Sequence, residues 1–511
     1  MLISLLPPEI LAHVFHLLVV EEPPFSRRQK QGWIRVTHVC RHWRQVALDD
    51  SSLWARICVL PTNTKWVSKM LARAKNAPLD IELNLNEVAT SSPKTLLMIP
   101  PYLSRTRQLH FHGLSMRHID SVREIFGWEA PALEHFELTV TAYSIINFQD
   151  VGVNMLFKGH APRLRAFSLS GVVIPWSLIP RGQLTQLKIA CRKDGLYFPN
   201  DLNQLVDLLV NCPALELLAL ESCLPSQLTE FPYGRTIHLP HLSRLRLRGS
   251  TPCIMNMLNM LKIPSSTTLH MDCISEITST HYEPEGLLLS VISARFQSSA
   301  FVEFKSLTVT MRRNLKSSLN ITASTIPSTL QNRQTKKIEG DIVGNAELVL
   351  SFDGLSLPAH STDLLEQACK MLPILNLEFI SMSATNVNDI NPVELFGRCS
   401  NVTTMQATGC GTSGLVRALT AGTVAHGHAA IFPKLKSLEL AKLNFVEGPK
   451  HPSGTLFDVF ERGLQQRMAA SEAPLKLLRI RNCDISTEHA NGLQKLVENF
   501  HWDKNKGLFL W

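Results

Sequence analysis

The sequence predicts two regions of different fold class: an all-α N-terminal module and a long α/β array of repeats built on a parallel sheet. Three observations predict them. Apolar residues recur at helical spacing in short stretches before residue 60. A phrase of the form L-x-x-L-x-L returns from residue 79 onward, and helical patterns stand between many of its copies. Strands that alternate with helices favour a parallel sheet covered by helices.

The composition supports a large folded core and gives no reason to expect nucleic-acid binding. Of the 511 residues, 45% are hydrophobic and 18% are charged, against a typical charged share of about 25%. This excludes wholesale disorder. The 51 Lys and Arg residues exceed the 43 Asp and Glu residues by 8, and this mildly basic balance is not concentrated in one arm. Nucleic acid is therefore not an expected partner.

The cysteines and the N-terminus both predict an intracellular protein. The 11 cysteines are an odd number with no C-x-x-C pair, which is typical of a reduced chain. Residues 1–20 are apolar, but they lack a basic n-region, and Pro7, Pro8 and Glu9 interrupt the hydrophobic run. We therefore expect no signal peptide, no membrane partner, and a location in the cytoplasm or the nucleus.

The N-terminal module contains three expected helical segments, and the first begins at Pro8 because proline is tolerated in the first turn of a helix. Its apolar residues at helical spacing are Ile10, Leu11, Val14, Phe15 and Leu18. The second segment, bent or divided near Arg41, contains Trp33, Val36, Cys40, Trp43 and Ala47. The short third segment follows capping residues at 49–52 and contains Leu53, Trp54 and Ile57. A core this small predicts exposed apolar surface for a partner.

Four segments of this module carry one motif: residues 6–11 (LPPEIL), 14–15 (VF), 39–47 (VCRHWRQVA) and 53–57 (LWARI). Their order, spacing and aromatic positions closely resemble the F-box motif, in the form abundant among mushroom-forming fungi. The linker from Val19 to Gln31 is longer than in compact F-boxes. The chain begins almost on the motif, which leaves an upstream segment open.

The resemblance implies docking on the Skp-type adaptor of an SCF ubiquitin ligase, the complex built on a cullin and a RING subunit. At the positions that match the motif, the adaptor contacts or the packing directly beneath them would come from Leu6, Pro7, Ile10, Leu11, Phe15, Val39, Cys40, Trp43, Leu53 and Trp54. The alternative is that most of these residues form the small core of the module. For Leu11, Val14 and Trp43 the two interpretations have equal weight.

The repeated phrase predicts a short strand in each copy, with alternate residues pointing inward, so that stacked copies form a parallel sheet. The clearest copies span residues 133–138, 164–169, 215–220, 242–247, 435–440 and 475–480. Weaker copies or fragments span residues 109–111, 184–189, 269–271, 304–309, 348–350, 374–379 and 402–407. Helical patterns between the copies span residues 202–209, 365–372, 456–464 and 493–500.

This array resembles a divergent leucine-rich-repeat solenoid, and the resemblance implies a curved parallel sheet. Such repeats often close the strand phrase with Asn or Cys, and the positions that match are Cys191, Cys223, Cys410 and Cys483. We expect buried thiols there, without a reactive role. A sheet of about thirteen strands suits a macromolecular target better than a metabolite.

The two resemblances set the expected domains. An F-box domain occupies residues 1–60, and the leucine-rich-repeat solenoid occupies residues 61–511. Residues 314–340 fit the repeat poorly and are expected to form a mobile insertion. Residues 420–430 are expected to form a second exposed loop.

A glycine-rich segment is one candidate for a dinucleotide-binding site, but the acidic residue that such a site needs is not at the right place. Residues 409–414 match G-x-G-x-x-G, and a strand-like segment precedes them. A dinucleotide site also needs an acidic residue about twenty positions later at the end of the next strand. The nearest candidate is Glu439, which lies between two leucines of the next phrase. A repeat turn is therefore the favoured interpretation.

Three histidine pairs are candidates for metal binding, and each lacks further ligands. His38 and His42 have the spacing of a helical metal pair, yet Val39 stands where a zinc protease has Glu. The pairs at 110 and 112 and at 426 and 428 have no carboxylate or thiolate close by in the sequence. We therefore predict no metal, no cofactor and no catalytic residue, so the protein is not expected to be an enzyme.

The combined interpretation is a substrate-receptor subunit of an SCF-type ubiquitin ligase. The F-box would dock on the Skp-type adaptor, and the repeats would bind a target protein and raise its effective concentration at the ligase. The alternative is a non-catalytic protein-binding scaffold that is not linked to ubiquitination, which needs the same docking surface. A third interpretation, an enzyme built around residues 409–414, has much weaker support.

Overall fold

The computed structural model divides the chain into two compact units, Met1–Leu242 with Leu261–Ile263, and Ser243–Met260 with Pro264–Trp511. It describes residues 6–22, 32–59, 64–85, 93–141, 146–149, 152–191, 202–224, 234–275, 284–297, 303–313, 317–327, 347–355, 358–385, 392–409, 413–420, 431–445, 455–470 and 474–505. The expected boundary after residue 60 stays a prediction. Every helix in the described residues is too short or too polar to cross a lipid bilayer.

The described residues of the N-terminal module form helical elements up to Trp54, as the sequence predicts. Its elements are α1 (Pro8–Glu21), the 3-10 helix η2 (Gly32–His38), α2 (Arg41–Asp49) and the 3-10 turn η3 (Ser51–Trp54). The predicted division of the second segment near Arg41 is confirmed, because η2 ends at His38 and Cys40 caps α2. The Cys40 sulfur accepts a hydrogen bond from the Trp43 backbone N–H at 3.5 Å.

The predicted third helical segment is correct for Leu53 and Trp54 and wrong for Ile57. Ile57 lies in strand β1 (Arg56–Val59), which pairs in parallel with β2 (Leu79–Asn84) and sets Ile57 beside Ile81. The partner strand lies further along the chain, so local spacing does not reveal the pairing. The helical module therefore passes directly into the first strand of the sheet, and its all-α character ends at η3.

The first unit contains a parallel sheet in the order β1-β2-β3-β4-β6-β8-β9. The strands after β2 are β3 (Thr106–Leu114), β4 (His135–Val140), β6 (Ala166–Ser170), β8 (Gln186–Ala190) and β9 (Leu217–Glu221). Two short parallel pairs lie apart from this sheet: β5 (Ile146–Asn147) with β7 (Val172–Val173), and β10 (Ile237–His238) with β12 (Leu261–Lys262). The copies of the phrase predicted as strands between residues 109 and 220 are confirmed.

The core of the first unit lies between the strands and the short helices that connect them. The α-helices are α3 (Thr64–Arg73), α4 (Ile119–Phe126) and α5 (Leu202–Val210). The 3-10 turns are η4 (Pro93–Met98), η5 (Pro100–Arg105), η6 (Met116–His118), η7 (Phe157–Gly159) and η8 (Trp176–Leu178). Phe126, Phe136 and Phe157 are fully buried, with ring centroids 5.2 to 5.9 Å apart. This aromatic cluster fixes helix α4 against strand β4.

The second unit contains a sheet in the order β11-β13-β16-β15-β14-β17-β18-β19-β20-β21. Its strands are β11 (Arg244–Ser250), β13 (Thr268–Ile274), β14 (Ser306–Arg313), β15 (Ser317–Ser324), β16 (Leu348–Leu355), β17 (Phe379–Thr385), β18 (Thr404–Thr408), β19 (Ser437–Ala441), β20 (Leu477–Arg481) and β21 (Asn499–Trp502). The pairings align one row of buried apolar residues: Leu245, Leu269, Leu348, Ala323, Leu307, Ile380, Met405, Leu438 and Leu478. Within this row, Leu245, Leu307, Met405, Leu438 and Leu478 are the second apolar residues of predicted copies of the phrase. The predicted copy at 374–379 is misplaced, because β17 begins at Phe379 and contributes Ile380 to the row.

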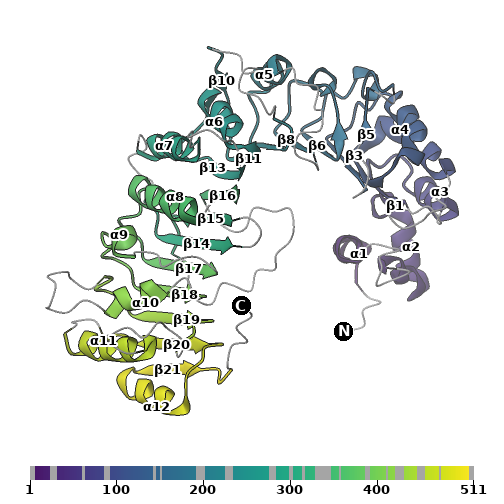
Figure 1. Cartoon of the computed structure of the whole chain (residues 1–511). Helices are drawn as coiled ribbons and strands as arrows, with labels where there is room; N and C mark the ends of the chain where they lie inside the picture. The colour runs from purple at the N-terminus through teal and green to yellow at the C-terminus, as the bar shows by residue number, and fades with distance from the viewer. Residues whose placement is uncertain are drawn as a thin grey trace. The chain divides into compact units, whose positions relative to one another are not determined.

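Helices of the second unit lie along one side of its strands, as Figure 1 shows. They are α6 (Thr251–Met260), α7 (Pro284–Gln297), α8 (Pro358–Met371), α9 (Pro392–Phe396), α10 (Ser413–Thr420), α11 (Leu456–Ala470) and α12 (Thr487–Leu496). Thr455 caps α11, because its hydroxyl accepts a hydrogen bond from the Asp458 N–H at 3.2 Å. Large, mostly parallel sheets with helices therefore follow the helical N-terminal module, whereas the predicted curvature stays a prediction.

The predicted mobile insertion at 314–340 is wrong for residues 317–324, which form a strand. Ser317–Ser324 form β15, which pairs antiparallel with both β14 and β16. Its apolar residues Leu319, Ile321 and Ala323 are buried and alternate with polar residues. The serines hide this period-two pattern, because serine is more common in turns than in strands. Residues 314–316 and 328–346 lie outside the described residues.

The predicted last helix is wrong at its C-terminal end. Helix α12 ends at Leu496, and Phe500 lies in β21, which pairs in parallel with β20. A parallel strand supplies hydrogen-bond partners that the helical spacing of Leu493, Leu496 and Phe500 does not reveal.

The glycine-rich segment ends a strand, as expected for a repeat turn. Gly409 follows β18 with a φ of 92°, a left-handed conformation that favours glycine. Helix α10 begins at Ser413. Residues 410–412 lie outside the described residues, as does most of the predicted loop at 420–430.

Three of the four cysteines that close the phrase lie in the described residues and are shielded from solvent. Cys223 and Cys483 are buried and Cys191 is half-buried. Burial raises the pKa of the Cys191 thiol to about 12 and that of Cys483 to about 11, and it raises the pKa of Cys223 well above its ordinary value. These thiols stay protonated at neutral pH, which fits the predicted packing role.

Candidate functional site

Trp54 is the anchor of the N-terminal module. Its indole lies edge-on to Trp33 with ring centroids 5.0 Å apart, and its Nε1 donates a hydrogen bond to the Ala47 carbonyl at 2.7 Å. The guanidinium of Arg73, from α3, lies 4.2 Å from the Trp54 ring centroid. One side chain therefore joins η2, α2, η3 and α3.

Helix α1 packs on this framework through one of its faces. Leu11, Phe15 and Val19 are buried at i, i+4 and i+8. The Phe15 ring lies 5.3 Å from the Trp43 ring, which attaches α1 to α2. Leu11 and Phe15 are therefore packing residues beneath any surface on α1, and Trp43, which is half-buried, lies at its edge.

A polar contact between α1 and the start of η3 complements this packing. His16 Nε2 lies 2.9 Å from Asp50 Oδ2, and the Ser52 N–H donates to Asp50 Oδ1 at 3.0 Å. Burial acts against ionisation of Asp50, but the hydrogen bonds from Ser52 and His16 outweigh it and hold the pKa of Asp50 below its ordinary value.

We expect Asp50 to make the stability of the first unit dependent on pH. Because the pKa of Asp50 is lower in the folded state than in the unfolded state, its contribution is present above about pH 4 and is lost as pH falls through the folded pKa. The urea midpoint of Asp50→Asn should therefore lie below that of the unmodified protein at pH 6 and approach it at pH 3.5. A difference in midpoint that is the same at both values would contradict this role.

The other side of α1 presents an apolar stripe, formed by Ile10, Val14 and Leu17. These side chains are 51%, 39% and 57% exposed. Their i, i+4, i+7 spacing places them on one side of the helix. Together with the buried face, the stripe makes α1 apolar on two sides. Neighbouring apolar side chains left in solvent on so small a module mark a surface for a partner protein.

In the structure, some of the predicted site residues lie on the surface of the module and others are buried in its core. Pro7, Ile10, Val39 and Cys40 are exposed, and Leu6 and Trp43 are half-buried. Leu11, Phe15, Leu53 and Trp54 are buried. Contact of these residues with an adaptor stays a prediction.

Sequence reasoning missed Leu17 as a site residue and left Val14 undecided. The signal was present, because α1 has apolar residues at two sets of helical spacings rather than one. A helix that is hydrophobic on two sides is normally covered on both.

The comparison with protein families matches the same part of the chain. The F-box-like family model matches residues 3–60, which include all elements from α1 to β1. F-box domains generally bind Skp-type adaptors. The chain therefore contains an F-box-like domain at its N-terminal end. No curated protein matches the sequence.

One histidine pair of the sheet has a carboxylate neighbour that the sequence did not reveal. The parallel register places His110 between Glu82 on β2 and Glu137 on β4, and His110 Nδ1 lies 3.9 Å from Glu137 Oε2. Burial lowers the pKa of His110, although Glu137 acts in the opposite direction. Within the described segments, no group of three or more His, Cys, Asp or Glu residues is arranged to hold a metal ion.

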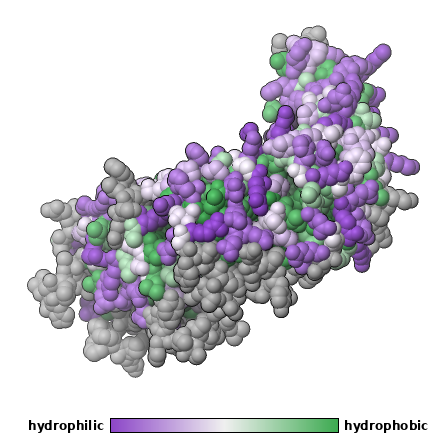
Figure 2. Space-filling view, turned by 90° about the horizontal axis from the view of Figure 1, so that it is seen from above, coloured by the Kyte–Doolittle hydropathy of each residue, from purple (hydrophilic) through white to green (hydrophobic). Residues whose placement is uncertain are grey.

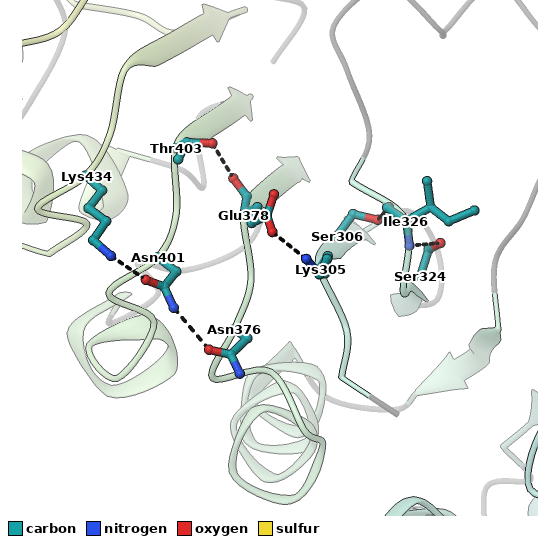
Figure 3. A network of polar contacts seen from close by, with 9 residues as sticks. All are labelled: Lys305, Ser306, Ser324, Ile326, Asn376, Glu378, Asn401, Thr403 and Lys434. Atoms are coloured by element: carbon teal, nitrogen blue, oxygen red, sulfur yellow. Dashed lines mark hydrogen bonds and ion pairs between the residues drawn. The ribbon is translucent and has the colours of Figure 1, made fainter. Parts of the chain in front are cut away.

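Polar residues in the turns before β14, β17, β18 and β19 bind one another. Lys434 Nζ donates to Asn401 Oδ1 at 2.8 Å, and Asn401 Nδ2 donates to Asn376 Oδ1 at 3.0 Å (Figure 3). Lys305 Nζ donates to Glu378 Oε1 at 2.8 Å. These contacts join successive repeats, so these polar side chains bind one another and stabilise the array.

Apolar side chains on the face drawn in Figure 2 form small patches among hydrophilic residues. Exposed large hydrophobic residues outside the N-terminal module include Trp128, Met155, Leu287 and Leu375, which are far apart in the sequence. Single exposed apolar residues of this kind are normal on protein surfaces. The stripe on α1 differs because its members are neighbours on one helix.

Proposed function

We propose that this chain is a substrate-receptor subunit of an SCF-type ubiquitin ligase. The F-box-like domain docks on a Skp-type adaptor, which connects it to the cullin and RING subunits, and the sheet region holds a target protein. The observation that carries the proposal is the apolar stripe on α1, because it lies inside the family match and has no cover in the described residues. The chain needs no catalytic residue for this role, since a receptor acts by raising the concentration of target near the ligase.

Co-purification with the ligase subunits tests the proposal. The intact chain, co-expressed with a Skp-type adaptor, a cullin and a RING subunit, should elute with all three as one complex in size-exclusion chromatography. Elution of the chain apart from the adaptor would contradict the proposal. Because β1 pairs with β2, deleting residues 1–61 would expose a sheet edge, so point variants on α1 are a cleaner control than truncation.

The alternative function is a non-catalytic protein-binding scaffold that is not linked to ubiquitination. Both functions use the stripe on α1, so binding of the adaptor does not distinguish them. A complex that contains the adaptor but excludes the cullin and RING subunits would favour the scaffold. A complex of all four proteins that transfers ubiquitin to a protein bound by the chain would favour the receptor.

A further inference from the structure

Strand β21 forms one edge of the sheet of the second unit. Within the described residues it pairs with β20 alone. The Asn499 N–H donates to the Lys476 carbonyl, on the β20 side, at 2.9 Å. In a parallel ladder the backbone groups of successive residues point to opposite sides, so those of Phe500 and Trp502 point away from β20. The N–H and C=O groups of these two residues therefore lie along the outer edge of the sheet.

The apolar core is also incomplete at this edge. The register places Phe500 beside Leu478 and Trp502 beside Ile480, so both aromatic residues continue apolar rows of the sheet. Leu478 and Ile480 are fully buried, whereas Phe500 and Trp502 are half-buried. The Trp502 indole N–H is inaccessible to water and has no hydrogen-bond partner among the described residues. Buried donors without a partner are rare in folded proteins, so this edge has the properties of a surface that another strand covers.

Sheet edges that stay in solvent normally carry features that block further pairing. Proline, β-bulges and charged side chains directed into the sheet are common examples. The sequence of β21 is Asn-Phe-His-Trp, which contains no proline and directs no charge into the sheet, and its pairing with β20 has no register shift. An edge of this kind favours the addition of one more strand.

The sequence around β21 is complementary to itself under a twofold axis. In an antiparallel pair centred on His501, Phe500 of one copy lies opposite Trp502 of the other, and these residues exchange four backbone hydrogen bonds. Both aromatic residues lie on the apolar face, where aromatic cross-strand pairs stabilise a sheet. At each end of the pair, the exposed Glu498 of one copy faces the exposed Lys504 of the other. Lys504 lies in the turn that ends β21, so its long side chain makes this contact.

We propose that β21 binds a second copy of this chain as an antiparallel strand, which joins the two sheets into one. The pairing is isologous, so each copy contributes the same residues and both free edges close together. The small area of a four-residue strand gives a weak dimer that depends on concentration. The dimer carries two F-box-like domains, and it forms without the adaptor because β21 lies outside residues 3–60.

Sedimentation equilibrium of the full-length chain tests this assignment through charge reversal. The unmodified chain should dimerise as its concentration rises to about 100 μM. Glu498→Lys and Lys504→Glu should each raise the dissociation constant of the dimer about tenfold, because each variant places two pairs of like charges across the interface. An equimolar mixture of the two variants restores opposite charges in both pairs. The mixture should therefore associate about as tightly as the unmodified chain.

The matched control is Lys436→Glu, which reverses an exposed charge in the turn before β19 and should leave the dissociation constant unchanged. All three substituted residues are exposed, so the thermal unfolding midpoint should stay that of the unmodified chain. Three results would overturn the assignment. They are a monomer at every concentration, a dimer that both charge reversals at the β21 edge leave intact, and a mixture of the two variants that associates no better than either variant alone.

Discussion

Replacing Ile10, Val14 and Leu17 with glutamine is expected to weaken binding of a Skp-type adaptor by on the order of a hundredfold, as measured by calorimetry with the full-length chain. Each central apolar contact of a protein interface contributes about 1 kcal/mol or more, and three such losses give this factor. Because the three side chains are exposed, the thermal unfolding midpoint should hardly change. Glutamine is chosen because its helix propensity is close to that of leucine.

Glu9→Gln with His13→Gln is the matched control for the stripe. Both residues are polar, exposed and on the same helix, so this variant alters α1 without removing the stripe. It should bind the adaptor about as tightly as the unmodified chain. Equal binding by the stripe variant and this control would mean that the adaptor surface lies elsewhere on the module.

Trp54→Ala is expected to destabilise the first unit by about 3–5 kcal/mol, as measured by urea unfolding. The substitution removes a fully buried indole, which leaves a cavity between η2, α2 and α3. It also removes the hydrogen bond to the Ala47 carbonyl and the contact with Arg73. Loss of adaptor binding should accompany this loss of stability, in contrast to the stripe variant.

Two other substitutions show whether the loss of unfolding free energy in Trp54→Ala arises from the burial of its indole. Trp128 is 46% exposed, so Trp128→Ala should cost far less than Trp54→Ala. Trp54→Phe keeps an aromatic ring in the core, so its loss of unfolding free energy should lie between those of Trp128→Ala and Trp54→Ala. If the exposed and buried tryptophans gave the same change in unfolding free energy, Trp54 would not be the anchor of the module.

The order of strands and helices was predictable wherever the signal is local. The phrase at 215–220 overlaps β9 and the phrase at 475–480 overlaps β20, because a short strand needs only alternating inward residues and a preceding turn. Helix α5 follows from the spacing of leucines at 202–209 in the same way. These signals lie within one element and do not depend on its neighbours.

The errors occur where a distant segment decides the structure. Ile57 has the spacing of a helix but pairs through β1 with β2, and Phe500 lies in β21 beside β20. β15 contains serines typical of a loop, yet it lies between two strands that satisfy its backbone hydrogen bonds. Pairing across the sheet therefore overrides local preference at these positions.

The sequence alone determined that an F-box-like helical module precedes a region of repeated strands and helices, because both signals are carried by short-range spacing. Only the tertiary structure decided which apolar residues of α1 remain exposed, since Leu11 and Phe15 are buried, Phe15 against Trp43 of α2, while Ile10 and Leu17 are exposed. It also left Phe500 and Trp502 half-buried at the edge of the second sheet, although they continue rows that are fully buried in β20. Burial and strand pairing depend on contacts between elements, and a single sequence records the elements more directly than the contacts.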